Sequence, residues 1–110
     1  TEEYYYPDSK IKLDILTRYS ATGVSRSTWE GALVMGKFIE KNYEQLFRNR
    51  LDLTILELGS GTGLGGTHIA KLLASHKIKA DIYMTDICVK ALSTANKNLI
   101  RNQVDGVKVE

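Results

Sequence analysis

The sequence has few residues of the kinds that stabilise a fold through covalent or metal cross-links. Cys88 is the only cysteine among 110 residues, which excludes an internal disulfide and the thiolate cluster of a structural zinc site. A chain without disulfides fits a reducing, cytoplasmic setting. His68 and His76 are the only histidines, and because no third ligand accompanies them, we expect no metal site.

An excess of charge of one sign is also absent. The 15 Lys and Arg residues against 13 Asp and Glu give a net charge of +2, too small to favour a nucleic acid or an anionic membrane as partner. No apolar run approaches the roughly 20 residues needed to span a bilayer, and the acidic start TEEYYY is unlike a signal peptide. With 43% hydrophobic and 25% charged residues, we expect a globular chain of one domain or less.

Glycine, in contrast, is concentrated in one place. Residues 51–66, LDLTILELGSGTGLGG, contain five glycines within eight positions, directly after an apolar run. A glycine-rich turn between a strand and a helix lies at the carboxyl edge of a parallel sheet, where open α/β folds bind ligands. The amino terminus of the following helix offers free N–H groups to an anionic part of the ligand. The loop therefore predicts a nucleotide-like ligand that the backbone approaches closely.

The spacing of the apolar residues predicts the elements around this loop. Residues 10–16, KIKLDIL, alternate as in a strand with one solvent-facing side, whereas the first nine residues form a flexible lead-in or an edge. Ser27 and Glu30 have capping-box spacing, which predicts a helix to about Phe47. The run 53–58, LTILEL, is typical of a strand buried on both faces. The remaining elements are expected to be a helix over 66–76, a strand over 80–85, a helix over 89–102 and a strand from 107. This alternation implies parallel pairing with right-handed crossovers.

Two common glycine-rich motifs, the P-loop and the dinucleotide-binding fingerprint, match this sequence to different extents. A P-loop needs Lys and Ser or Thr after its last glycine; Gly61 and Gly66 have the spacing, but Thr and His follow, so we set phosphoryl transfer aside. The dinucleotide fingerprint G-x-G-x-x-G is matched by Gly61, Gly63 and Gly66, with Asp86 20 residues after the last glycine. An NAD(P)-dependent oxidoreductase therefore stays open as an alternative, as does a non-catalytic module that has kept the fold.

A third frame includes an acid, Glu57, two residues before the first glycine of ELGSGTG. This frame resembles the nucleoside-binding loop of class I, seven-strand methyltransferases, which bind S-adenosylmethionine (AdoMet). Together with STWEGALVMGKFIEKN upstream and TDICVKALSTANKNLIRN downstream, it is similar to the seven-strand protein-lysine methyltransferases, which modify chaperones and translation elongation factors. The likeness covers roughly residues 11–110. The family's tryptophan, its acid after the second strand and its N-x-x-x-N pair are matched by Trp29, Asp86, Asn98 and Asn102.

The resemblance implies AdoMet as cofactor, S-adenosylhomocysteine as product, and a set of binding residues. That set is Trp29, Glu57, Gly59, Ser60, Gly61, Gly63 and Asp86. Glu57 would attract the ammonium group of AdoMet, Asp86 would accept hydrogen bonds from the ribose hydroxyls, and Trp29 would offer a flat surface and an N–H donor. Each has a structural alternative: a core tryptophan, a structural pair for Glu57, and a helix N-cap for Asp86. Asn98 and Asn102 can satisfy nearby backbone groups, and we assign them no chemistry.

The resemblance also implies a Rossmann-like fold with a parallel sheet in a three-layer α/β/α arrangement. Residues 28–110 would be the N-terminal, cofactor-binding part of the methyltransferase domain, and residues 1–27 a lead-in with a short strand. No catalytic residue is assigned, because the groups around the acceptor lysine belong to a later part of the fold, and we expect this piece alone to be inactive and marginally stable. The family's acid-x-x-Tyr motif follows the fourth strand, so we interpret Tyr43 of EKNY as a core residue. The expected partner is a protein substrate of the chaperone or translation-factor class.

Overall fold

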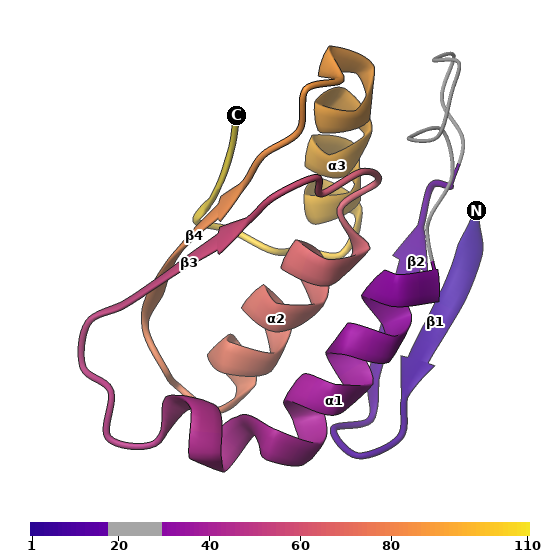
Figure 1. Ribbon diagram of the computed structural model, residues 1–110. Coiled ribbons are helices and arrows are strands. Elements are labelled where there is room, and N and C mark those ends of the chain that lie inside the picture. The colour runs from indigo at the N-terminus through magenta and orange to yellow at the C-terminus, as the bar shows by residue number, and fades with distance from the viewer. Residues whose placement is uncertain (18–29) are drawn as a thin grey trace.

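The computed structural model describes residues 1–17 and 30–110 (Figure 1). Trp29 and the capping-box residue Ser27 lie outside the described residues. The elements are, in chain order, β1 (Glu2–Tyr6), β2 (Ile11–Ile15), α1 (Glu30–Phe47), β3 (Leu53–Glu57), α2 (Leu64–Ser75), β4 (Ala80–Met84), α3 (Val89–Arg101) and β5 (Val107–Val109). Each predicted strand and helix is present, and α2 begins two residues earlier than expected, inside the glycine run.

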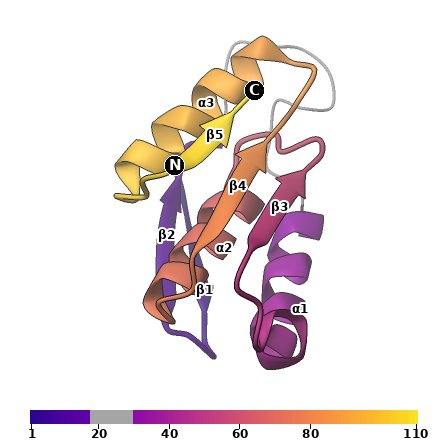
Figure 2. The ribbon, with the colours of Figure 1, turned by 90° about the vertical axis from the view of Figure 1, so that its left-hand side faces the viewer.

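The main sheet consists of β3, β4 and β5 in that order, and both pairs are parallel (Figure 2). The register aligns Leu53 with Ala80 and Glu57 with Met84. Because α2 joins β3 to β4 and α3 joins β4 to β5, the three strands form two consecutive βαβ units. The parallel α/β arrangement predicted from the sequence is therefore confirmed, and the glycine loop lies at its carboxyl edge.

The described helices all lie on one side of this sheet, and Figure 2 looks onto its other face. The prediction that residues 53–58 are buried on both faces is wrong for the described residues, because β3 alternates between half-buried and exposed positions. Leu56 is 60% exposed and Leu58 is 77% exposed. Within residues 1–17 and 30–110, no second layer of helices covers that face of the sheet (Figure 2).

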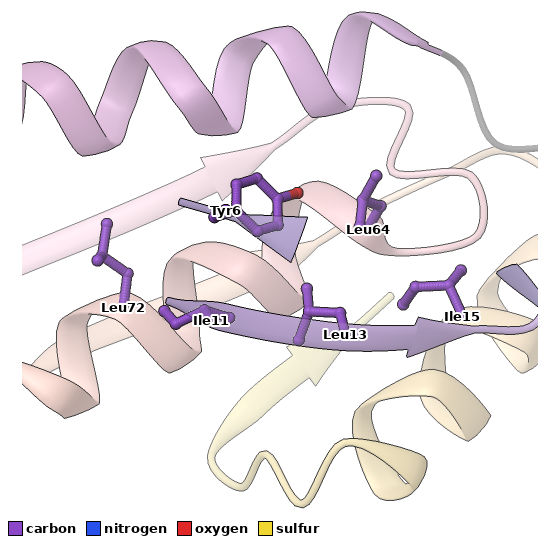
Figure 3. Packing of buried hydrophobic residues seen from close by; sticks show 6 residues of the cluster. All are labelled: Tyr6, Ile11, Leu13, Ile15, Leu64 and Leu72. Carbon is purple, nitrogen blue, oxygen red and sulfur yellow. The ribbon is translucent and has the colours of Figure 1, made fainter. Parts of the chain in front are cut away.

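Helix α2 is the centre of the molecule, between the main sheet and the β1–β2 hairpin. Leu64 and Leu72 of α2 pack against the hairpin (Figure 3). Ile69 and Leu73 pack on the opposite side, against Ile82 of β4. Burial on two sides explains why this helix buries most of its residues rather than a single stripe.

The hairpin gives the first segment of the chain a definite structure. β1 pairs with β2 in antiparallel register, from Glu2 opposite Ile15 to Tyr6 opposite Ile11. Tyr6 is completely buried. The alternative of a flexible lead-in is therefore wrong for residues 2–6, whereas the alternation predicted for β2 is confirmed by its burial pattern. In the part of the chain described here, no helix has the length and apolar character needed to cross a bilayer.

Candidate cofactor site

The glycine loop runs from Glu57, the last residue of β3, to Leu64, the first residue of α2. Gly59, Gly61 and Gly63 have φ angles of 66°, 56° and 89°, in the left-handed region that residues with a side chain rarely adopt. The loop is tied to the neighbouring strand end, because the Ser60 N–H donates to the carbonyl of Thr85 at 2.8 Å. Its backbone course therefore requires glycine at alternate positions.

The space around these glycines differs from one to the next. A Cβ added at Gly59 or Gly61 would meet no atom within 4 Å. A Cβ at Gly63 would lie 2.9 Å from the Cβ of Ala95 and 3.1 Å from Met84 Cε. Gly63 is thus required by packing against α3, whereas Gly59 and Gly61 border open space.

The last two glycines of the run, Gly65 and Gly66, lie against the carboxylate of Glu57, the acid that precedes the loop. Any side chain at Gly65 would collide with the carboxylate of Glu57, and one at Gly66 would collide with the thioether of Met84. The Gly66 N–H donates to Glu57 Oε1 at 3.1 Å. Glu57 therefore accepts a hydrogen bond from the first turn of α2, where backbone N–H groups have no partner within the helix.

Glu57 has an altered proton affinity. Burial raises the pKa of Glu57 to about 7; the negative charge of Asp86 adds to the rise, and the hydrogen bond from Gly66 opposes it. Burial disfavours the charged form of a carboxyl group, as is common in binding sites. A ligand cation next to Glu57 would stabilise the carboxylate.

Asp86 connects the glycine loop with the start of α3. Its Oδ2 accepts the Gly61 N–H at 2.9 Å, and its Oδ1 accepts the Cys88 N–H at 2.8 Å. The N-cap position of α3 is Cys88, so Asp86 is not the N-cap considered from the sequence, although it does bond to the backbone there. Because each carboxylate oxygen has two lone pairs, both oxygens keep an acceptor position.

A cavity of about 460 Å³ opens between α1, β3 and the glycine loop. Its polar lining includes the Glu57 carboxylate and Ser60, whose Oγ is buried and has no hydrogen-bond partner among the described residues. Its apolar lining includes Met35, Ile39 and Leu58. An organic ligand with both charged and apolar parts matches this combination.

The structure brings most of the predicted site together. Glu57, Gly59, Ser60 and Gly61 line the cavity. Gly63 supports the loop from the side of α3, and Asp86 bonds to Gly61 without lining the cavity. The position of Trp29 lies outside the described residues.

The histidines take part in ring contacts instead of a metal site. His68 Nε2 lies 2.6 Å from Glu40 Oε2, and its ring stacks on Tyr6 with centroids 3.8 Å apart. His76 stacks on Tyr43, which packs against the core as predicted. Residues 1–17 and 30–110 contain no group of three His, Cys, Asp or Glu side chains placed to hold a metal ion. The sequence held no local signal for the His68 pair, because its partner lies 28 residues away.

The fold defines the class of protein. The chain superposes on a solved chain from Listeria monocytogenes, assigned as a class I S-adenosylmethionine-dependent methyltransferase, with a TM-score of 0.62 and 13% identity. The match covers 82% of this chain and 27% of that chain. The fold is therefore that of the class I methyltransferases, in agreement with the sequence prediction.

Sequence comparison then identifies the family. A model of the lysine methyltransferase family matches residues 8–110, and the chain belongs to that family. It is 31% identical to methyltransferase-like protein 22 of Mus musculus over 98 residues, which are 87% of this chain and 22% of that protein. It is 34% identical to EEF1A lysine methyltransferase 3 of Xenopus tropicalis over 104 residues, 93% of this chain and 41% of that protein. A shorter match, 39% over 59 residues, is to the release factor glutamine methyltransferase of Flavobacterium psychrophilum, covering 54% of this chain and 19% of that protein. The chain thus spans less than half the length of each of these relatives.

Proposed function

We propose that this chain binds AdoMet as part of an AdoMet-dependent methyltransferase that modifies lysine side chains of a protein. The observation that carries the proposal is the open space at Gly59 and Gly61, beside the Glu57 carboxylate and the unpartnered hydroxyl of Ser60. These groups fit a ligand that combines an ammonium group with hydrogen-bonding and apolar parts. Membership of the lysine methyltransferase family supports the same ligand.

The residues have distinct roles in this proposal. When bound, AdoMet supplies a methyl group on a sulfonium centre. Glu57 holds the ammonium group as a carboxylate, and Asp86 accepts hydrogen bonds from the ribose hydroxyls through its two remaining acceptor positions. The loop backbone at Gly59 and Gly61 allows close approach. Positioning of the methyl group against an incoming nitrogen would supply much of the rate enhancement.

The acceptor proposed is a lysine amine, which must lose its proton before it can attack. The support comes from the family and from a relative whose name identifies it as a lysine methyltransferase of EEF1A. Translation factors are therefore the first substrates to test, with chaperones next, and we place the reaction in the cytoplasm. The match over 59 residues to a protein named as a glutamine methyltransferase makes a glutamine acceptor the alternative to test.

Calorimetric titration tests the cofactor directly. We expect the protein to bind AdoMet and S-adenosylhomocysteine and not NADH. Binding of NADH without AdoMet would replace the proposal with an oxidoreductase, and binding of neither would favour a module without a cofactor. Because we expect this chain alone to be inactive, the acceptor is tested separately with a full-length protein that contains it, incubated with AdoMet and unmodified translation elongation factor 1A and followed by peptide mass spectrometry. A methyl group on glutamine and none on lysine would contradict the proposed acceptor.

A further inference from the structure

Two buried asparagines bind the backbone of the β2 segment, Asn98 from within α3 and Asn102 from its C-cap position. Asn98 Oδ1 accepts the N–H of Leu16 at 2.7 Å, and Asn98 Nδ2 donates to the carbonyl of the same residue at 3.1 Å. Asn102 makes the equivalent pair with Asp14, with both distances at 2.9 Å. Asn98 is 0% exposed and Asn102 is 6% exposed. Each amide therefore pairs with both polar groups of one residue, as a neighbouring strand would.

The spacing of the asparagines matches the spacing of their partners. Four residues along a helix advance about 6 Å, and two residues along a strand advance about 6.6 Å. Asp14 and Leu16 are two apart, so their N–H and C=O groups point to the same edge of the strand, away from β1. The N-x-x-x-N pair thus replaces a third strand at this edge, and it protects backbone groups that would otherwise be unpaired.

Asn98 differs from Asn102 in one contact. Its Nδ2 also donates to the carbonyl of Thr62 at 2.8 Å. Thr62 is 2% exposed and lies in the glycine loop between Gly61 and Gly63. The additional bond of Asn102 goes to the carbonyl of Asn98 itself, and among the described residues Asn102 has no hydrogen bond to the loop.

The bond from Asn98 to Thr62 fixes a part of the loop that has few side chains to pack. The glycines on both sides of Thr62 have left-handed φ angles and no side chain to pack. A buried carbonyl needs a hydrogen-bond partner, because an unsatisfied one is costly. The amide of Asn98 supplies that partner and, with Ala95 one turn before it on α3, forms the surface on which the loop rests.

We infer that Asn98 is a positioning residue for the cofactor loop, which it links to the hairpin through a single side-chain amide. The part of this inference that concerns ligand affinity rests on the proposed AdoMet function. The part that concerns loop order does not, because the bond from Asn98 to Thr62 involves only residues of this chain. Asn102 is the matched control, since it makes the same pair of bonds to the strand edge and none to the loop.

Amide hydrogen exchange tests the loop without a ligand. The reporters are the N–H groups of Ser60 and Gly63, which bond to Thr85 and Ser60. In Asn98→Ala we expect their protection factors to fall about tenfold relative to those of β4, the loss expected for one buried hydrogen bond. In Asn102→Ala, the protection factors of the loop and of β4 should change by the same factor. Equal loop protection in wild type and Asn98→Ala, or the same loop effect in both variants, would overturn the inference.

A second variant and a second measurement keep the test decisive. If Asn98→Ala does not fold by circular dichroism, Asn98→Asp has nearly the same shape and keeps an acceptor for the N–H of Leu16, but its carboxylate cannot donate to the carbonyl of Thr62 or to that of Leu16. Among folded variants, the Kd for AdoMet should rise about tenfold for the Asn98 variant and less than about twofold for Asn102→Ala. Faster loop exchange with unchanged affinity would refute the positioning role. Failure of the wild type to bind AdoMet would refute the proposed function, while the exchange comparison would still decide the role of Asn98.

Discussion

Glu40 and His68 form a buried polar pair, with His68 Nε2 2.6 Å from Glu40 Oε2 and side chains 2% and 0% exposed. The same carboxylate accepts the N–H of Ser9 at 3.0 Å, and Tyr6 stacks on the imidazole ring. Gly36, one turn before Glu40, leaves the room that these rings occupy, because a Cβ there would lie 2.7 Å from Tyr6 Cε1. The pair therefore joins α1, α2 and the turn of the hairpin behind the cofactor site.

Removal of the Glu40 carboxylate should be strongly destabilising. Glu40→Ala leaves the buried ring nitrogen of His68 and the part-buried N–H of Ser9 without this acceptor, and we expect the free energy of unfolding to fall by about 3 kcal/mol. Glu44→Ala, one turn further along α1, removes an exposed pair with Arg48 and should cost about 0.5 kcal/mol or less. Urea denaturation of both variants measures the difference. Equal losses would show that the buried pair contributes no more than a surface pair.

His68 should make the protein less stable in acid. Burial lowers the pKa of His68, and the hydrogen bond and charge of Glu40 oppose this change only in part. The unfolded chain therefore binds a proton near pH 6.5 that the folded protein does not bind, so the stability contributed by the neutral ring is lost as the pH falls below 6.5. Because Glu57 titrates in the same range, denaturation midpoints between pH 5 and 8 in a Glu57→Gln background should show this loss, and adding His68→Gln should remove it. In that background, a stability that rises on acidification would contradict the neutral ring.

Glu57 should have the opposite pH dependence. Its pKa rises from 4.5 to about 7 on folding, so between these values the folded protein binds more protons than the unfolded chain. The contribution of Glu57 to stability consequently falls as the pH rises from 4.5 to 7. Glu57→Gln should flatten this part of the profile, and the His68 titration is best measured in that background. An unchanged slope in the variant would mean that Glu57 is already ionised throughout.

The same group should release a proton when the cofactor binds. An ammonium group beside Glu57 favours the carboxylate, so AdoMet binding near pH 7 should expel part of a proton. Calorimetry in two buffers of different ionisation enthalpy measures this number, and Glu57→Gln should reduce it to near zero. If the wild type bound AdoMet without releasing a proton, the ammonium group of AdoMet would not lie beside Glu57.

The sequence was sufficient to predict features formed by neighbouring residues, but not contacts between residues that are far apart in the chain. Glu57 and the glycines are adjacent in the chain, so their pattern predicts the loop and its ligand class. The bond from Asn98 to Leu16 joins residues 82 apart, and the sequence could show only that the amide would satisfy some backbone group. The exposure of Leu56 likewise depends on which elements cover the sheet, and a run of apolar residues does not reveal this.

The glycines of the loop should respond differently to alanine. Gly61→Ala places a methyl group in open space, so it should cost only the left-handed backbone strain of about 1 kcal/mol while it weakens AdoMet binding about tenfold or more. Gly63→Ala adds a clash with Ala95 and should cost roughly 1–3 kcal/mol more. Denaturation and calorimetry on the two variants separate the effect on folding from the effect on binding.

A double variant checks the cause of the larger loss. Ala95→Gly removes the Cβ that a side chain at position 63 would meet, although it costs about 1 kcal/mol of helix propensity by itself. In a double-mutant cycle with Gly63→Ala, the coupling energy should therefore be favourable, since the second substitution relieves the first. Simple additivity would place the cost of Gly63→Ala in the backbone of the loop or in the remaining contacts with Ala95 Cα and Met84 Cε, both at 3.1 Å, rather than in the contact with Ala95 Cβ. A favourable coupling with no recovery of AdoMet affinity would show that the loop conformation, and not only its stability, depends on this contact.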